Sequence, residues 1–159
     1  MSAGLKPPAL DPASVAGRKG TGYPAPFRDG IKDREKRQLA VALGLNNFGV
    51  NLVRLPPGEI SSQRHWHSRQ DEFIYILEGE VVLVTDGGEQ VLTPGMCAGF
   101  RAGVPNGHRM LNRGRSAALY LEVGDRSPDD VGHYPDIDLE ARAADGRRYV
   151  FTHKDGTPY

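Results

Sequence analysis

"RHWHSRQDEFIYILEGE", residues 64–80, places two histidines one residue apart and then a carboxylate at the start of an apolar run. Side chains two positions apart on a strand point to the same face, so the imidazoles of His65 and His67 can reach one ion there. Glu72 joins this face only if the chain turns or bulges through "SRQD", residues 68–71. The stretch therefore predicts either a metal site on a β-sheet or an ordinary polar strand edge.

The residues that follow favour the metal site over the polar edge. Ile74 and Ile76 continue the face of Glu72 as an apolar wall, where a lone carboxylate is costly to bury and a cation relieves that cost. A further histidine, His108, follows a Gly/Pro-rich loop in "FRAGVPNGHRMLN", residues 100–112. Three imidazoles and one carboxylate suit zinc, iron, manganese, nickel or copper better than calcium or magnesium.

The segment around these residues has the pattern of an all-β domain, a sandwich or a barrel. The chain contains 20 glycines and 12 prolines, and both residue types interrupt helices and mark turns. Short apolar runs alternate with turn residues, and "DGG" at 86–88 predicts a hairpin. Strands are expected at residues 48–55, 72–79, 80–85, 89–92, 97–101, 107–112 and 116–123.

The two ends of the chain differ in composition from this central barrel, residues 46–124. Residues 1–45 read as an N-terminal arm without a core of its own, because prolines and glycines crowd its first 30 positions. Within the arm, residues 33–44 predict a short helix from Asp33 to Gly44, or alternatively a strand. Residues 125–159 form a polar C-terminal extension that is expected to add one strand and to pack on the barrel.

Composition limits the class of protein. With 159 residues the chain suits one domain, and 20 basic against 20 acidic residues give no net charge to attract nucleic acid. A single cysteine, Cys97, excludes an intrachain disulfide and is expected to be a small buried hydrophobe. Neither a secretion signal nor an apolar run of membrane-spanning length is found, so a cytoplasmic protein without membrane partners is predicted.

The two histidine segments together resemble the signatures of the cupin superfamily. The first signature is a glycine, H-x-H, a glutamate and a second glycine, and it is matched by Gly58, His65, His67, Glu72 and Gly79. The second combines a glycine, a P-x-G turn, a histidine and an asparagine, and residues 99–112 resemble it. Arg101 stands where the turn proline is usual, and two residues are inserted before His108.

The resemblance implies a double-stranded β-helix, a jelly-roll barrel that leaves few free edges. It implies one divalent transition metal ion (Zn, Fe, Mn or Ni) on His65, His67, Glu72 and His108, together with a homodimer and a small-molecule substrate. The chain is also similar to bacterial single-domain cupins that are labelled sugar-phosphate isomerase-like. A metal-dependent isomerase or lyase is therefore the first hypothesis for its function.

Two other hypotheses stay open at this stage. One is an iron-dependent dioxygenase that uses the same ligands, and the other is a non-catalytic, metal-containing module that senses or binds a small molecule. Gln63, Arg64 and Arg101 are candidate substrate-binding residues, although both arginines are equally compatible with solvated surface charges. Four other residues are expected to pack or to lie on the surface, away from the metal: Trp66, Tyr75, His133 and His153.

Overall fold

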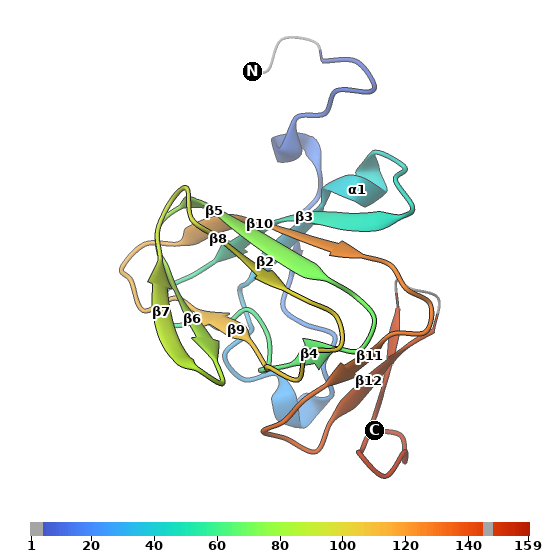
Figure 1. Ribbon diagram of the computed structural model, residues 1–159. Coiled ribbons are helices and arrows are strands. Elements are labelled where there is room, and N and C mark those ends of the chain that lie inside the picture. Colours follow the sequence, from blue (N-terminus) through green and yellow to red (C-terminus); the bar gives the residue numbers. More distant parts are fainter. Residues whose placement is uncertain (1–4, 145–147) are drawn as a thin grey trace.

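The computed structural model of the protein describes residues 5–144 and 148–159, and almost all of its regular structure is antiparallel β (Figure 1). The prediction of an all-β fold is confirmed. The helices are short: η1 (Pro12–Ser14), η2 (Ala25–Phe27) and α1 (Leu39–Ala42). In the part of the chain that the structure describes, no helix is both long enough and apolar enough to span a bilayer.

The largest sheet has six strands, in the order β1-β2-β3-β10-β5-β8. Their bounds are β1 Arg18–Lys19, β2 Glu35–Gln38, β3 Phe48–Leu55, β5 Glu72–Glu78, β8 Cys97–Phe100 and β10 Ala118–Asp125. β10 pairs along its whole length with β3 and also pairs with β5, so it is a central strand. The N-terminal strands β1 and β2 extend this sheet beyond β3.

A three-stranded sheet, in the order β7-β6-β9, closes the other side of the barrel. Its strands are β6 Val81–Thr85, β7 Gly88–Leu92 and β9 Arg109–Leu111, and the expected hairpin joins the first two. Gly79 links β5 to β6 with φ of +71°, and a Cβ there would lie 2.9 Å from backbone atoms of Ala117 and Ala118. Glycine is required at this link, because a side chain would meet both strain and a backbone clash.

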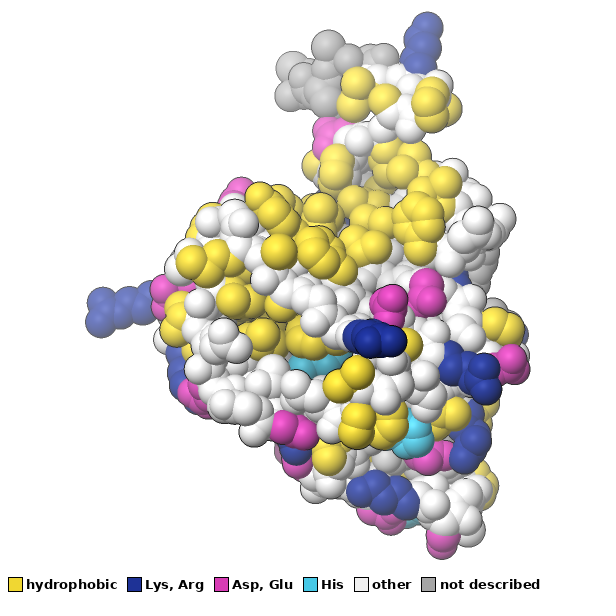
Figure 2. Space-filling view, viewed as in Figure 1, with side chains coloured by type: hydrophobic (Ala, Val, Ile, Leu, Met, Phe, Trp, Pro, Cys, Tyr) yellow, Lys and Arg dark blue, Asp and Glu magenta, His cyan; other side chains and the backbone are white. Residues whose placement is uncertain are grey.

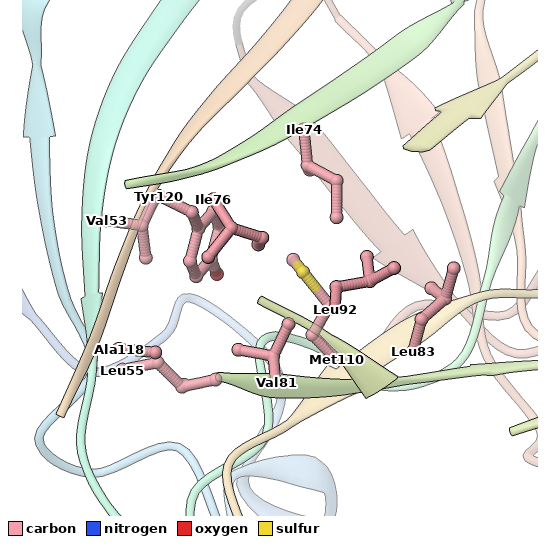
Figure 3. Close-up of a cluster of buried hydrophobic side chains, with 10 residues drawn as sticks. All are labelled: Val53, Leu55, Ile74, Ile76, Val81, Leu83, Leu92, Met110, Ala118 and Tyr120. Atoms are coloured by element: carbon pink, nitrogen blue, oxygen red, sulfur yellow. The ribbon is translucent and has the colours of Figure 1, made fainter. Parts of the chain in front are cut away.

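The main hydrophobic core lies between these two sheets (Figure 3). Strand β5 shows the alternation that creates it, since Ile74 and Ile76 are 3% and 0% exposed whereas Phe73 is 42% exposed. The core comprises Val53, Leu55, Ile74, Ile76, Val81, Leu83, Leu92, Met110, Ala118 and Tyr120. The apolar wall predicted to follow Glu72 is therefore part of the barrel interior.

The C-terminal extension forms a four-stranded sheet with part of the histidine motif, in the order β13-β12-β11-β4. The strands are β4 Trp66–His67, β11 Val131–His133, β12 Glu140–Ala143 and β13 Tyr149–Thr152. The prediction of a single strand here was incomplete, because two of its three strands are short and polar. β11 pairs with the distant β4, and this pairing leaves no local pattern in the sequence.

A second hydrophobic cluster joins the two ends of the chain. Tyr23 and Ile31 from the N-terminal arm pack with Tyr134, Leu139 and Ala141 from the C-terminal extension. Ile31 and Leu139 are only 2% and 0% exposed, so this is a true core. In the described residues the arm thus shares a hydrophobic cluster with the extension.

Two local predictions need correction. Residues 33–44 contain a strand followed by a single helical turn, β2 and then α1, so each of the two alternatives holds for part of the segment. Cys97 is exposed and not buried. It pairs with Tyr75 on the outer face of the six-stranded sheet, whereas its neighbour Ala98 packs against the core.

Candidate metal centre

Backbone pairing brings the two histidine segments together. His67 lies in β4 and Glu72 is the first residue of β5, so both strands place their side chains at one end of the barrel. His65 and His108 form an isolated antiparallel bridge, with N–H to O distances of 3.1 and 2.9 Å. This bridge places His108 beside His65 although 42 positions separate them in the sequence.

The ligand atoms of these residues converge on one oxygen. The Nε2 atoms of His65 and His67 each lie 3.6 Å from Oε2 of Glu72. His108 Nε2 lies 2.8 Å from the same oxygen. Ligand atoms of His65, His67 and Glu72 all lie within 4.8 Å of one another. Even so, this buried oxygen has no hydrogen-bond partner of suitable geometry in the described residues.

Hydrogen bonds on the far side of two imidazoles determine which nitrogen faces Glu72. His65 Nδ1 lies 2.9 Å from the carbonyl oxygen of Gln63, and His67 Nδ1 lies 2.5 Å from Oδ2 of Asp130. A carbonyl or a carboxylate only accepts, so each Nδ1 carries the proton and each Nε2 presents a lone pair. Lone pairs that face a carboxylate repel it unless a cation lies between them. The residues therefore fit a bound divalent metal ion.

His108 is positioned in a different way. Its ring stacks on Phe100, with ring centroids 3.5 Å apart and an interplanar angle of 5°. The side chain is buried, and Nδ1 has no hydrogen-bond partner within the described residues. Aromatic packing, and not a hydrogen bond, thus directs Nε2 of His108 towards Glu72.

The pKa values of these groups follow from burial and from their mutual proximity. Burial lowers the pKa of His65 to about 4. Burial alone would raise the pKa of Glu72, but the neighbouring imidazoles, His67 foremost, hold it well below its usual range. Burial would lower the pKa of His67, but the carboxylates of Glu72 and Asp130 outweigh it and raise that pKa. Carboxylates on both sides of His67 thus favour positive charge at this position.

Two cavities meet at this group of residues. The larger has a volume of about 570 Å³ and is lined by His65, His67 and Glu72 together with residues of the arm, the barrel and the extension. The smaller, of about 200 Å³, is lined by His67, Glu72 and His108. Figure 2 shows histidine surface within a hollow near the middle of one face. A ligand on either side can therefore approach the candidate metal-binding residues.

Comparison with known proteins identifies the superfamily. A sequence profile of the cupin domain family matches residues 51–124. The chain is 46% identical to a sugar phosphate isomerase of the cupin superfamily from Silicibacter pomeroyi, with 96% of each chain covered and a TM-score of 0.87. This protein is a cupin. The predicted membership of the cupin superfamily and the predicted jelly-roll barrel are both confirmed.

Other solved cupin structures support the fold alone. A protein of Acidithiobacillus ferrooxidans, provisionally named a sugar phosphate isomerase, is 24% identical over 80% of each chain, with a TM-score of 0.70. A predicted oxalate decarboxylase from Thermotoga maritima is 22% identical over 74% of this chain and 97% of its own, with a TM-score of 0.60. No curated protein matches the chain at a significant level.

The three candidate substrate-binding residues occupy different environments in this cupin. Arg64 donates to both oxygens of Asp136, at 2.8 and 2.6 Å, and also to Asp86, which raises its pKa. Its charge is thus committed to an ion-pair network, and it is absent from the residues that line the two cavities. Gln63 donates from its side chain to Phe27, while its carbonyl accepts from His65. Arg101 is exposed and lines the smaller cavity.

The remaining polar and aromatic candidates lie outside the metal-binding group. His133 stacks on Trp66, with centroids 4.2 Å apart, and approaches Ser68 at 2.8 Å through Nε2. His153 approaches Asp138 and stacks on Tyr159. In the described ranges these two histidines belong to no group of three or more metal-ligating side chains. Tyr75, at 38% exposed, faces outward from β5 as its position in the strand predicted.

Asp130 is the residue of this site that the sequence did not reveal. It lies in the C-terminal extension, directly before β11, and is 1% exposed. Besides approaching His67, it accepts hydrogen bonds from the backbone N–H of Arg69 at 2.8 Å and the hydroxyl of Tyr149 at 3.0 Å. Asp130 thus holds the ring of His67 in the tautomer that metal binding requires.

Replacing Asp130 with asparagine should weaken metal binding by about 10- to 100-fold, the usual cost of losing a partner of a ligand histidine. The amide can donate to Nδ1, which moves the imidazole proton to Nε2 and blocks the ligand atom. A competition titration against a chelator measures the effect. Asp138→Asn is the matched control, because Asp138 contacts the remote His153. Equal metal affinity in both variants would remove Asp130 from the site.

Proposed function

We propose that this cupin is a metal-dependent enzyme of the isomerase or lyase type that acts on a small oxygenated substrate. A single divalent transition metal ion, zinc, iron, manganese or nickel, would be its cofactor. The proposed ligands are His65, His67, Glu72 and His108. The observation that carries the proposal is the opening of a cavity of about 570 Å³ onto His65, His67 and Glu72, a volume suited to a small-molecule substrate.

The metal ion would polarise a substrate carbonyl and stabilise the enediolate formed when a neighbouring proton is removed. The protein's own residues would orient the ligands and the substrate. Asp130 and Phe100 fix two of the imidazoles. Burial raises the pKa values of Tyr134 and Tyr149, so both cavity-lining hydroxyls stay neutral. The hydroxyl of Tyr134 donates to Tyr23 and that of Tyr149 donates to Asp130, so their oxygens are left to accept hydrogen bonds from substrate hydroxyls.

The similar protein from Silicibacter pomeroyi supports this reaction class. Its name is sugar phosphate isomerase, and the likeness extends over 96% of both chains. The N-terminal and C-terminal segments that complete the larger cavity are included in that coverage. A sugar phosphate is accordingly the first substrate class to test.

Solvent exchange tests the proposed reaction directly. The metal-loaded protein is incubated in D₂O with a panel of aldose and ketose phosphates and followed by proton NMR. An isomerase that uses an enediolate should exchange the hydrogen next to the carbonyl for deuterium and form the isomeric sugar. The exchange should disappear when the metal is removed by a chelator and return when it is restored. Absence of both exchange and product across the panel would contradict the isomerase proposal.

Two further measurements on the metal-loaded protein distinguish the alternative functions. Consumption of oxygen by iron-loaded protein with a candidate substrate would indicate a dioxygenase. Saturable binding of a small molecule, without product or proton exchange, would indicate a sensing or binding module. The isomerase proposal predicts neither outcome.

The outer face of the six-stranded sheet supports a homodimer as part of this proposal. Phe73, Tyr75 and Leu77 on β5 are 38–42% exposed, and Figure 2 shows hydrophobic side chains gathered over this part of the molecule. Light scattering should give twice the chain mass of 17.3 kDa. Phe73→Glu should shift the protein towards the monomer, whereas a monomeric wild-type protein would contradict the dimer.

A cytoplasmic location, consistent with one exposed cysteine, completes the proposal.

A further inference from the structure

The larger cavity carries an excess of positive charge. Five of its lining residues are cationic and three are carboxylates, a formal surplus of 5 − 3 = +2 before any metal ion is counted. The cations are Arg18, Arg34, Lys36, Arg126 and Arg148. The carboxylates are Glu72, Glu122 and Asp125. A cavity of this charge favours an anionic ligand.

Arg34 differs from Lys36 in how its charge is balanced. Lys36 is paired with Glu122 at 2.6 Å. Among residues 5–144 and 148–159, the guanidinium of Arg34 donates only to the backbone carbonyls of Gly20, at 2.9 Å, and Ser61. In the described part of the chain no carboxylate lies within ion-pair distance of it. Arg34 is thus a half-buried cation with no direct ion pair in the described residues. The buried carboxylate of Glu122, whose pKa Arg34 helps to lower, is already paired with Lys36, so an anionic ligand would stabilise the guanidinium.

The guanidinium is also held in place with donors to spare. Its two backbone contacts occupy one N–H on each terminal nitrogen, so three of the five N–H donors of an arginine have no acceptor among the described residues. One of these three, on Nε, is shielded from water. A guanidinium that is held through both terminal nitrogens and still has N–H groups available to donate is suited to bind an oxyanion.

The position of Arg34 relates it to the metal centre. It contacts the carbonyl of Ser61, and the hydroxyl of the next residue, Ser62, lies 3.3 Å from Nδ1 of His65. Arg34 therefore borders the loop that carries the first metal-binding histidine, and both residues line the same cavity. One small molecule can contact the guanidinium with one end and the metal with the other.

We infer that Arg34 binds the phosphate group of a small phosphorylated substrate whose other end reaches the metal. A phosphate monoester carries a charge close to −2 at neutral pH, which matches the surplus of the cavity walls better than a carboxylate does. The inference rests on the proposed function, because it assigns one part of the same substrate. It places phosphate recognition in the N-terminal arm, outside the segment that matches the cupin domain family.

Calorimetric titration of the metal-loaded protein with inorganic phosphate tests this site. Arg34→Gln should weaken phosphate binding by about 10- to 100-fold, the range expected for charge-assisted hydrogen bonds. Arg34→Lys keeps the charge but loses the fork, and it should bind with intermediate affinity. The matched control is Arg113→Gln, which removes the same charge from an exposed pair with Glu89 and should bind as the wild type does. Metal content is measured in each variant.

Equal phosphate affinity in the wild type and both Arg34 variants would overturn the inference, because phosphate would then be bound by the metal or elsewhere. If Arg34→Gln fails to fold, Arg34→Lys and a phosphate-soaked wild-type crystal give the answer. The phosphorus should lie about 4 Å from Cζ of Arg34, within the contact range of a paired guanidinium and oxyanion. If phosphate binding depends on Arg34 but no substrate is turned over, only the isomerase proposal is contradicted. If a substrate is turned over but phosphate binding does not depend on Arg34, only the phosphate subsite is contradicted.

Discussion

The double variant His65→Ala, His67→Ala should lose its bound metal when it is purified without added ions. Two of the four converging side chains are then absent, and Glu72 and His108 alone cannot hold a transition metal tightly. The metal affinity should fall by more than about 100-fold, since losing only the hydrogen-bond partner of a ligand already costs about 10- to 100-fold. Elemental analysis of the purified protein, followed by titration with a chelator, measures both quantities.

A second double variant provides the control for this experiment. His133→Ala, His153→Ala removes the same two chemical groups from positions outside the metal-binding residues. Its metal content should equal that of the wild type. Comparable metal in all three proteins would contradict the proposed ligands, provided that circular dichroism shows the variants to be folded.

Replacing Ile76 with alanine should lower the free energy of unfolding by about 2–5 kcal/mol, the usual cost of truncating a buried aliphatic side chain. Ile76 is 0% exposed and lies between the two sheets of the barrel (Figure 3). Truncation leaves a cavity that its neighbours on β10 and β3 fill only in part. This is the largest stability effect that we expect from a single substitution in the core.

The next residue along the strand is the matched control. Leu77 points to the opposite face of β5 and is 38% exposed in the single chain, so in the Phe73→Glu background, which removes the proposed dimer contact, Leu77→Ala should change the free energy of unfolding by less than about 1 kcal/mol. Chemical denaturation of both variants compares the two values. Similar losses at both positions would contradict the observed alternation of buried and exposed residues along β5.

The barrel could be predicted from the sequence because its signals are local. β3 was expected at residues 48–55 and is Phe48–Leu55, since alternating apolar residues run up to a Pro-Pro-Gly turn. The β6–β7 hairpin follows in the same way from the glycines between its strands. By contrast, β11 and β12 are short, and their order depends on pairing with the distant β4. Pairing between strands that are distant in the chain produces no periodic pattern of apolar residues.

The candidate site could be predicted only where its residues belong to the cupin signatures. Two distant motifs indicated His65 and His108, and the backbone bridge between them gives the physical reason why they meet. Asp130 and Arg34 lie outside both motifs, one in each terminal segment. Nothing in the residues around them signals a buried carboxylate behind His67 or a guanidinium without a direct ion pair in the described residues. Only the folded chain shows these roles.

The terminal segments therefore line the candidate site as well as completing the fold. Tyr23 and Arg34 of the arm and Tyr149 of the extension line the same cavity as Glu72 of the barrel. The second hydrophobic cluster, which joins arm and extension, holds these walls in place. The barrel supplies the proposed metal ligands, and the two ends of the chain complete the chamber around them.

X-ray absorption spectroscopy at the edge of the bound metal, combined with anomalous diffraction, tests the central claim most directly. We predict one metal ion per chain, located between His65, His67, Glu72 and His108. Three nitrogen ligands and one carboxylate oxygen should surround it at about 2.0–2.2 Å, the usual range for such ligands. An ion bound elsewhere, or an occupied site that lacks His108 or Glu72 from its ligands, would contradict the proposed centre.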